Sequence, residues 1–99
     1  MIKVLIKRVI AEGLEANYEQ TIVELLNHAE RSPGFLGGES YKDAKKPNQY
    51  VVVSSWESSN AWDLWFRSRE RAIMQKKIGV YLMEPEKFTI LEPCVYQRA

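Results

Sequence analysis

The alternation of polar and apolar positions predicts four β-strands. In IKVLIKRVI, the residues Ile2, Val4, Ile6 and Ile10 fall on one face of an extended chain, and β-branched side chains are frequent. The clearest strand is QYVVVSSW, in which both faces are apolar. Strands are expected at residues 2–10, 35–43, 49–56 and 87–96. The pair Gly37-Gly38 predicts a bulge or a close backbone contact, and Pro93 places part of the last strand at an edge or bulge.

A period of three to four residues predicts two helical segments between these strands. The first covers residues 14–31, and Ser32-Pro33-Gly34 ends it. Its apolar face consists of Leu14, Tyr18, Ile22, Leu25 and Ala29. The second begins at about residue 59, after a Glu57-Ser58-Ser59 stretch that suits a helix N-cap. Ser68 is expected to cap a continuation over residues 69–78.

The resulting order, βαββαβ, predicts an α+β, ferredoxin-like fold with a four-stranded antiparallel sheet in a single domain over residues 1–99. Two helical segments cover only one face of such a sheet. Val51 and Val53 fall on one face of the third strand, and Tyr50 and Val52 fall on the other, so both faces are apolar. A second copy packing sheet to sheet would bury the uncovered face, and a homodimer is therefore expected.

Composition excludes several classes of function. The net charge of +1 gives no field that would attract nucleic acid or an anionic membrane, and no apolar stretch is long enough to span one. The N-terminal stretch lacks the pattern of a signal peptide, so a cytoplasmic protein is expected. Cys94 is the one cysteine, which excludes an internal disulfide and a metal site built on several cysteines. It is interpreted as a small apolar strand residue, with a reactive thiol as the alternative.

Three stretches of the sequence resemble the antibiotic biosynthesis monooxygenase family of dimeric α+β barrels: KRVIAEG, SPGFLGGESYKD and VVVSSWESSNAWDLWFRSR. The resemblance implies a pocket between the sheet and the second helix. Members of this family oxidise phenols or quinols with O₂ and use no metal or flavin. One branch instead binds and degrades haem through an Asn on the first strand, a Trp on the second helix and a His further along the chain.

The haem branch is matched at one of these three positions. Trp65 corresponds to the Trp, whereas Gln75 stands at the position of the His, and Ile6 or Lys7 at that of the Asn. The one histidine, His28, lies on the first predicted helix and is interpreted as an exposed or rim side chain.

The segment from Trp56 to Arg71 carries most of the candidate site. Trp56 is interpreted as structural and Trp62 as packing, while the resemblance makes Trp65 a pocket-lining catalytic candidate. Arg69 follows Trp65 by four residues, where it would balance the charge of a phenolate or carboxylate, or would be a solvated surface residue. The candidate ligand contacts are Ile6, Phe66, Ile73 and Tyr81, with core packing as the alternative for Phe66 and Ile73 and a structural anchor as the alternative for Tyr81.

Three hypotheses of function follow. The first is a cofactor-independent monooxygenase that oxidises a small phenolic, quinol or polycyclic aromatic substrate with O₂. The second is a non-catalytic dimer that binds a small aromatic ligand. The third is a haem-binding or haem-degrading monooxygenase. The first two require no cofactor and no metal site.

Overall fold

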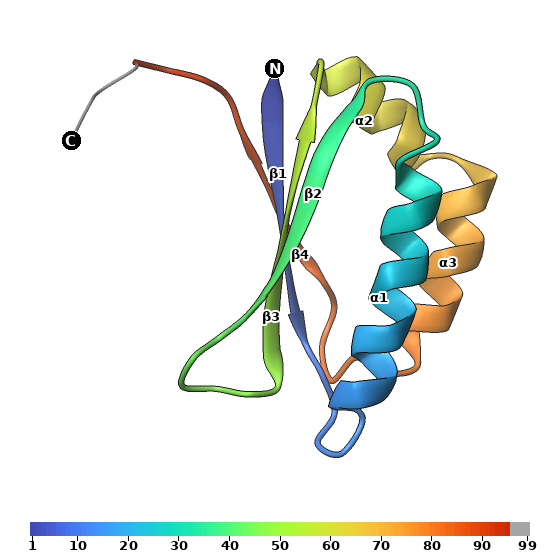
Figure 1. Ribbon diagram of the computed structural model, residues 1–99, viewed down its shortest axis with the longest axis vertical. Helices are drawn as coiled ribbons and strands as arrows, with labels where there is room; N and C mark the ends of the chain where they lie inside the picture. The colour runs from blue at the N-terminus through green and yellow to red at the C-terminus, as the bar shows by residue number, and fades with distance from the viewer. Residues whose placement is uncertain (96–99) are drawn as a thin grey trace.

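The computed structural model describes residues 1–95 as a four-stranded antiparallel sheet with helices on one face (Figure 1). The elements are β1 (Ile2–Val9), α1 (Glu15–Ala29), β2 (Phe35–Lys42), β3 (Gln49–Trp56), α2 (Ser59–Phe66), α3 (Arg69–Gly79) and β4 (Lys87–Leu91). The strand order is β2-β3-β1-β4, with β1 and β3 in the centre. The predicted ferredoxin-like α+β fold is confirmed.

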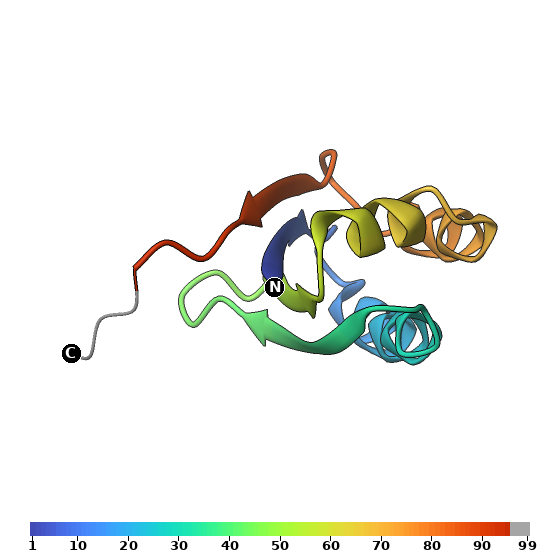
Figure 2. The same ribbon diagram turned by 90° about the horizontal axis from the view of Figure 1, so that it is seen from above.

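The second helical segment is divided into two helices at Arg67 and Ser68. Ser68 has extended backbone angles, φ −69° and ψ 150°, and its Oγ accepts a hydrogen bond from the backbone N–H of Arg71 at 3.1 Å. The same hydroxyl donates to the carbonyl oxygen of Trp65 at 2.7 Å. Ser68 therefore closes α2 and caps α3, as its sequence position predicted, and the two helices have different axes (Figure 2).

The last strand is shorter than predicted. It ends at Leu91 rather than at Tyr96, and Tyr96 itself lies outside the described residues. Leu91 pairs with Lys3, so one residue of β1 is left beyond this pair, and Pro93 has no N–H to donate to a ladder. The strand assignment of Cys94 was accordingly wrong, because this residue is exposed and lies after the strand. β4 is an outer strand of the sheet, as the edge prediction requires, but Pro93 itself lies after the strand.

The inner face of the sheet and the helices enclose the hydrophobic core. Every second residue of β1 and β3 points toward the helices and is buried. Tyr18, Ile22 and Leu25 of α1 pack against this face, as the helical period predicted. The sheet contributes Ile2, Val4, Ile6, Tyr50, Val52 and Trp56 to the same cluster.

The outer face of the sheet carries apolar side chains that no helix covers. Leu5 of β1 lies opposite Val53 of β3, and Val51 lies opposite Lys7. All three apolar residues remain partly accessible to solvent in the single chain. Both faces of the central strands are therefore apolar, as the sequence indicated, with lysines interspersed on the outer face.

Two glycines, Gly34 and Gly37, shape the backbone at the start of β2. The pairing with β3 shifts between Phe35 and Gly37, which confirms a bulge. Gly34 has φ +86°, a conformation that side chains with a Cβ rarely adopt. A Cβ at Gly34 would also lie 2.5 Å from the Cβ of Ala61 in α2, so glycine here allows the loop to approach that helix.

Replacing Gly34 with alanine is expected to lower the free energy of unfolding by about 1–3 kcal/mol. The added Cβ would be strained by the positive φ and would clash with Ala61. Urea denaturation followed by tryptophan fluorescence measures the change. The matched control is Gly79→Ala at the end of α3, where no atom lies within 4 Å of the added Cβ and the φ is not positive. There, stability should stay the same or rise. Equal losses in both variants would contradict this account.

Candidate functional site

A small cavity lies between the inner face of the sheet and the helices. Its volume is about 30 Å³, enough for one or two water molecules and far below the roughly 150 Å³ of a cavity that takes benzene. The lining comes from both central strands, the start of β2, α1 and α2. It consists of Ile6, Arg8, Ile22, Leu25, Leu26, Ala29, Phe35, Val52, Ser54, Trp56, Trp62 and Trp65. The cavity therefore lies where the resemblance placed a pocket.

The three tryptophans form one aromatic wall around Trp56. The ring centroid of Trp56 lies 5.7 Å from that of Trp62 in an edge-on contact and 6.4 Å from that of Trp65 in a stacked one. Phe35 adds a further edge-on contact with Trp56 at 5.1 Å. The Nε1 of Trp56 donates to Ser54 Oγ at 3.0 Å, so its polar edge is satisfied inside the core. The strand end and α2 thus place all three indoles of the chain around one cavity.

Two of the predicted site residues line this cavity. Trp65 and Ile6 are both buried and both belong to the lining. Phe66 and Ile73 are exposed and lie outside it, and the Tyr81 hydroxyl is 3.3 Å from Thr21 Oγ1. Their roles toward a ligand stay predictions.

Arg69 stands at the exposed start of α3, after the break at Ser68. The spacing of four residues from Trp65 does not place the two side chains on one helix face, because they belong to different helices. A charge-balancing role for Arg69 likewise stays a prediction.

Arg8 is the charged residue of the lining, and the sequence reasoning missed it. It follows Ile2, Val4 and Ile6 on the inner face of β1 and is 2% exposed. Its Nε donates to Glu86 Oε2 at 2.6 Å, and its Nη1 donates to the Tyr18 hydroxyl at 3.2 Å. The available signal was the alternation itself, which places this arginine in line with the apolar inward positions.

Glu86 joins Arg8 to α3. This carboxylate precedes β4, is 5% exposed, and accepts a hydrogen bond from Gln75 Nε2. Arg71 Nη2 lies 3.8 Å from its Oε1. Arg71 also lies over the ring of Phe66, with its Cζ 4.1 Å from the centroid. Gln75, which the sequence resemblance placed at the position of the haem-branch histidine, is therefore a partly buried member of this polar cluster.

Burial shifts the pKa values of three groups around this cluster. It raises the pKa of Tyr18, and the nearby Arg8 charge opposes the rise, so the phenol is protonated at neutral pH. Burial also raises the pKa of Tyr50, and the hydrogen bond that Tyr50 donates to Glu19 at 2.6 Å adds to the effect. For Arg71, burial lowers the pKa of the guanidinium while Glu86 acts in the opposite direction.

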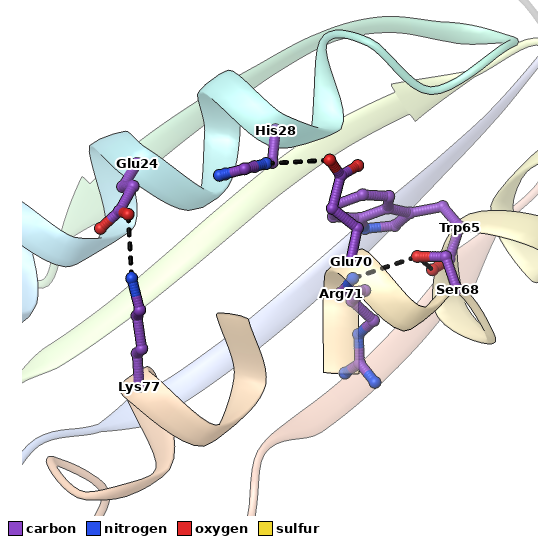
Figure 3. A network of polar contacts seen from close by, with 7 residues as sticks. All are labelled: Glu24, His28, Trp65, Ser68, Glu70, Arg71 and Lys77. Atoms are coloured by element: carbon purple, nitrogen blue, oxygen red, sulfur yellow. Dashed lines mark hydrogen bonds and ion pairs between the residues drawn. The ribbon is translucent and has the colours of Figure 1, made fainter. Parts of the chain in front are cut away.

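Exposed polar contacts join α1 to α3 beside the cavity (Figure 3). His28 Nδ1 lies 3.1 Å from Glu70 Oε1, and Lys77 Nζ lies 3.0 Å from Glu24 Oε1. Such solvent-exposed pairs contribute at most about 1 kcal/mol each, so they hold the helices together weakly. The side chain of His28 is 30% exposed and does not belong to the cavity lining. Residues 1–95 contain no group of three or more histidine, cysteine, aspartate or glutamate residues arranged to bind a metal ion.

A family model describes this chain. The model for antibiotic biosynthesis monooxygenases matches residues 1–77. The chain belongs to the antibiotic biosynthesis monooxygenase family. Within the described residues, no helix is long and apolar enough to cross a membrane.

The curated relatives that match are two strain versions of a mycobilin-producing haem oxygenase from Mycobacterium tuberculosis. The identity is 32% over 56 residues, which is 57% of this chain and 53% of the relative. The match thus spans about half the length of these relatives.

The solved structures confirm the fold. A crystal structure of an antibiotic biosynthesis monooxygenase aligns with a TM-score of 0.86 at 17% identity, and covers 96% of this chain and 100% of the other. SnoaB, a cofactor-independent oxygenase from Streptomyces nogalater, aligns with a TM-score of 0.84 at 15% identity, with 96% and 95% covered. At these identities the likeness establishes the architecture of the chain and leaves its chemistry open.

Replacing Arg8 with alanine is expected to cost about 3–5 kcal/mol of stability, because Glu86 then loses its closest cationic partner in a buried position. Chemical denaturation measures the loss. The double variant Arg8→Met/Glu86→Gln leaves neither member of the pair charged and should recover part of the loss, because Arg71 still loses Glu86 as its partner. A double variant as unstable as the single one would show that packing around Arg8, and not the unpaired carboxylate, sets the cost.

Proposed function

We propose that this protein is a cofactor-independent monooxygenase that oxidises a small phenolic, quinol or polycyclic aromatic substrate with O₂. The observation that carries the proposal is the aromatic wall of Trp56, Trp62 and Trp65 around a cavity that also contains Arg8. Flat indole faces suit a flat apolar ligand. Membership of the monooxygenase family and the architecture shared with SnoaB support the same reading.

The chemistry requires the protein to bind an electron-rich substrate away from water. In the balanced step, a phenol and O₂ give a quinone and water. One oxygen atom forms a bond to a ring carbon, the other leaves as water, and the substrate supplies all the electrons. The chain would contribute a dry aromatic cavity, with Trp65 and Ile6 against the ring and a cation near the ionised oxygen.

The cavity has to enlarge before an aromatic ring fits. At about 30 Å³ it accepts no ring, so side chains of α1 or α2 must move apart when the ligand enters. The weak exposed contacts between α1 and α3 are compatible with such a movement. Phe66, Ile73, Tyr81 and Arg69 would reach a ligand only if the enlarged cavity extends toward α3.

Haem degradation is the alternative that the Mycobacterium relatives favour, but the residues here do not fit the known arrangement. Gln75 donates to Glu86, and an amide is not among the side chains that commonly hold haem iron. The one histidine, His28, contacts Glu70 and does not line the cavity. No step of the proposed reaction therefore involves haem. A non-catalytic module that binds a small aromatic ligand is the remaining alternative, because the cavity lining contains no aspartate, glutamate or histidine that could act as a general base.

Oxygen uptake with a panel of naphthols, quinols and anthrones tests the proposal. The wild-type protein should consume O₂ with at least one of them, and Trp65→Phe should lower the rate about tenfold through a changed ring contact. The control is Leu64→Ala, an exposed neighbour on α2, which should keep the wild-type rate. Binding without uptake would support the ligand-binding module. Stoichiometric haem binding followed by degradation with a reductant would support the haem enzyme.

We also propose that the outer face of the sheet forms a homodimer interface, so that two chains build the α+β barrel. Light scattering at micromolar concentration should give twice the 11.5 kDa chain mass. Val53→Asp places a charge among Leu5 and Val51 on the uncovered face and should shift the mass toward the monomer. Val23→Asp, on the exposed face of α1, is the matched control and should leave the mass unchanged. A wild-type monomer throughout this range would refute the interface.

A further inference from the structure

The buried polar cluster beside the cavity has an excess of positive charge. Arg8 and Arg71 are two cations, and Glu86 is the one carboxylate that contacts either of them within residues 1–95. The side chains of the three are 2%, 14% and 5% exposed. Tyr18 does not supply the missing negative charge, because its phenol is protonated. Since a buried charge is stable only when it is paired, the cluster is suited to an additional anion.

Arg8 is the cation of this cluster that reaches the cavity. A guanidinium carries five N–H donors in a plane. Nε and Nη1 of Arg8 donate to Glu86 and Tyr18, whereas Nη2 makes no hydrogen bond within the described part of the chain. Within the described residues, every fully buried side-chain nitrogen or oxygen atom has a hydrogen-bond partner. Because Nη2 has none, it must be partly accessible to solvent. Nη2 therefore keeps its donors free within the described residues, and Arg8 lines a cavity whose other residues, apart from Ser54, are apolar or aromatic.

Glu86 fixes how the guanidinium is turned. Its Oε2 accepts a hydrogen bond from Arg8 Nε at 2.6 Å. Its Oε1 accepts a hydrogen bond from Gln75 Nε2 and lies near Arg71. The hydrogen bond to Tyr18 holds a second edge of the fork at 3.2 Å. With two edges anchored, the plane of the guanidinium is set, and the remaining edge needs no further ordering when a ligand binds.

We propose that Arg8 binds the ionised oxygen of an aromatic phenolate or enolate in the cavity, and that Glu86 is the positioning residue for Arg8. This inference rests on the proposed function, since it assigns the form in which that substrate is bound. It predicts that the site prefers the anion to the neutral phenol, because the guanidinium donates a charge-assisted hydrogen bond only to the anion. The substrate would then be held in its electron-rich form without a dedicated base.

Para-nitrophenol is a suitable probe, because it ionises near neutral pH and its phenolate absorbs at longer wavelength. Binding to the wild-type protein should lower the pKa of the probe by at least about one unit, which means at least about tenfold tighter binding of the phenolate than of the phenol. The charged and titratable groups near the bound oxygen are Arg8, Arg71, Glu86 and Tyr18. Glu19 lies further away and accepts a hydrogen bond from Tyr50.

The decisive variant is Arg8→Gln/Glu86→Gln, which leaves the net charge of the chain unchanged and no unpaired member of the pair. Its preference for the phenolate should fall to about twofold or less, even where the variant is as stable as the wild type. Arg8→Lys keeps a cation and should retain part of the preference. The control Lys76→Gln removes an exposed positive charge from α3 and should leave the preference unchanged.

The outcomes separate this inference from the proposed function. A phenolate preference that the double variant loses supports Arg8 as the anion-binding residue, whether or not any substrate is turned over. Equal binding of both forms, a preference that survives in the double variant, or no binding of the probe overturns it. Oxygen uptake at the wild-type rate, together with a phenolate preference that the double variant keeps, would retain the monooxygenase and refute the role of Arg8.

Discussion

A guanidinium and a carboxylate are buried together beneath the helices, and several parts of the fold meet at this pair. Arg8 comes from a central strand, Glu86 from the segment before the edge strand, Tyr18 from α1 and Gln75 from α3. Because neither charge is stable alone in the interior, these four segments have to come together for either to be buried. The same pair places a cation in the lining of an aromatic cavity between both central strands and the helices.

The tryptophans of the segment from Trp56 to Trp65 both pack the sheet against α2 and line the cavity. Trp56 ends β3 and packs against Phe35, Trp62 and Trp65, so it joins the sheet to α2. The same contacts leave the indole faces around the cavity. Trp56 and Trp65 are both buried and both line the cavity. Burial therefore does not distinguish a structural tryptophan from one that would contact a ligand. This arrangement explains why a core interpretation and a pocket interpretation of the tryptophans were both reasonable from the sequence.

Family membership and the solved structures establish the architecture of this chain, whereas the proposed chemistry rests on the residues that line the cavity. Gln75, which the sequence resemblance places at the position of the haem-branch histidine, donates a hydrogen bond to Glu86. The cation in the lining comes from the first strand and not from the arginine-rich stretch after Trp65. These two features are the basis for proposing an organic anion, and not haem, as the ligand.

The sequence by itself determined the order of strands and helices, the capping by Ser68, the bulge at Gly37 and the presence of two apolar faces. These features follow from local periods and local backbone preferences, which neighbouring residues carry. Only the tertiary structure decided that Arg8 meets Glu86, 78 residues away, because this contact requires β4 to lie beside β1. It also decided that Arg69 and Trp65 belong to separate helices and that the cavity is too small for a ring without movement. Such features depend on how distant segments pack, and no local pattern encodes them.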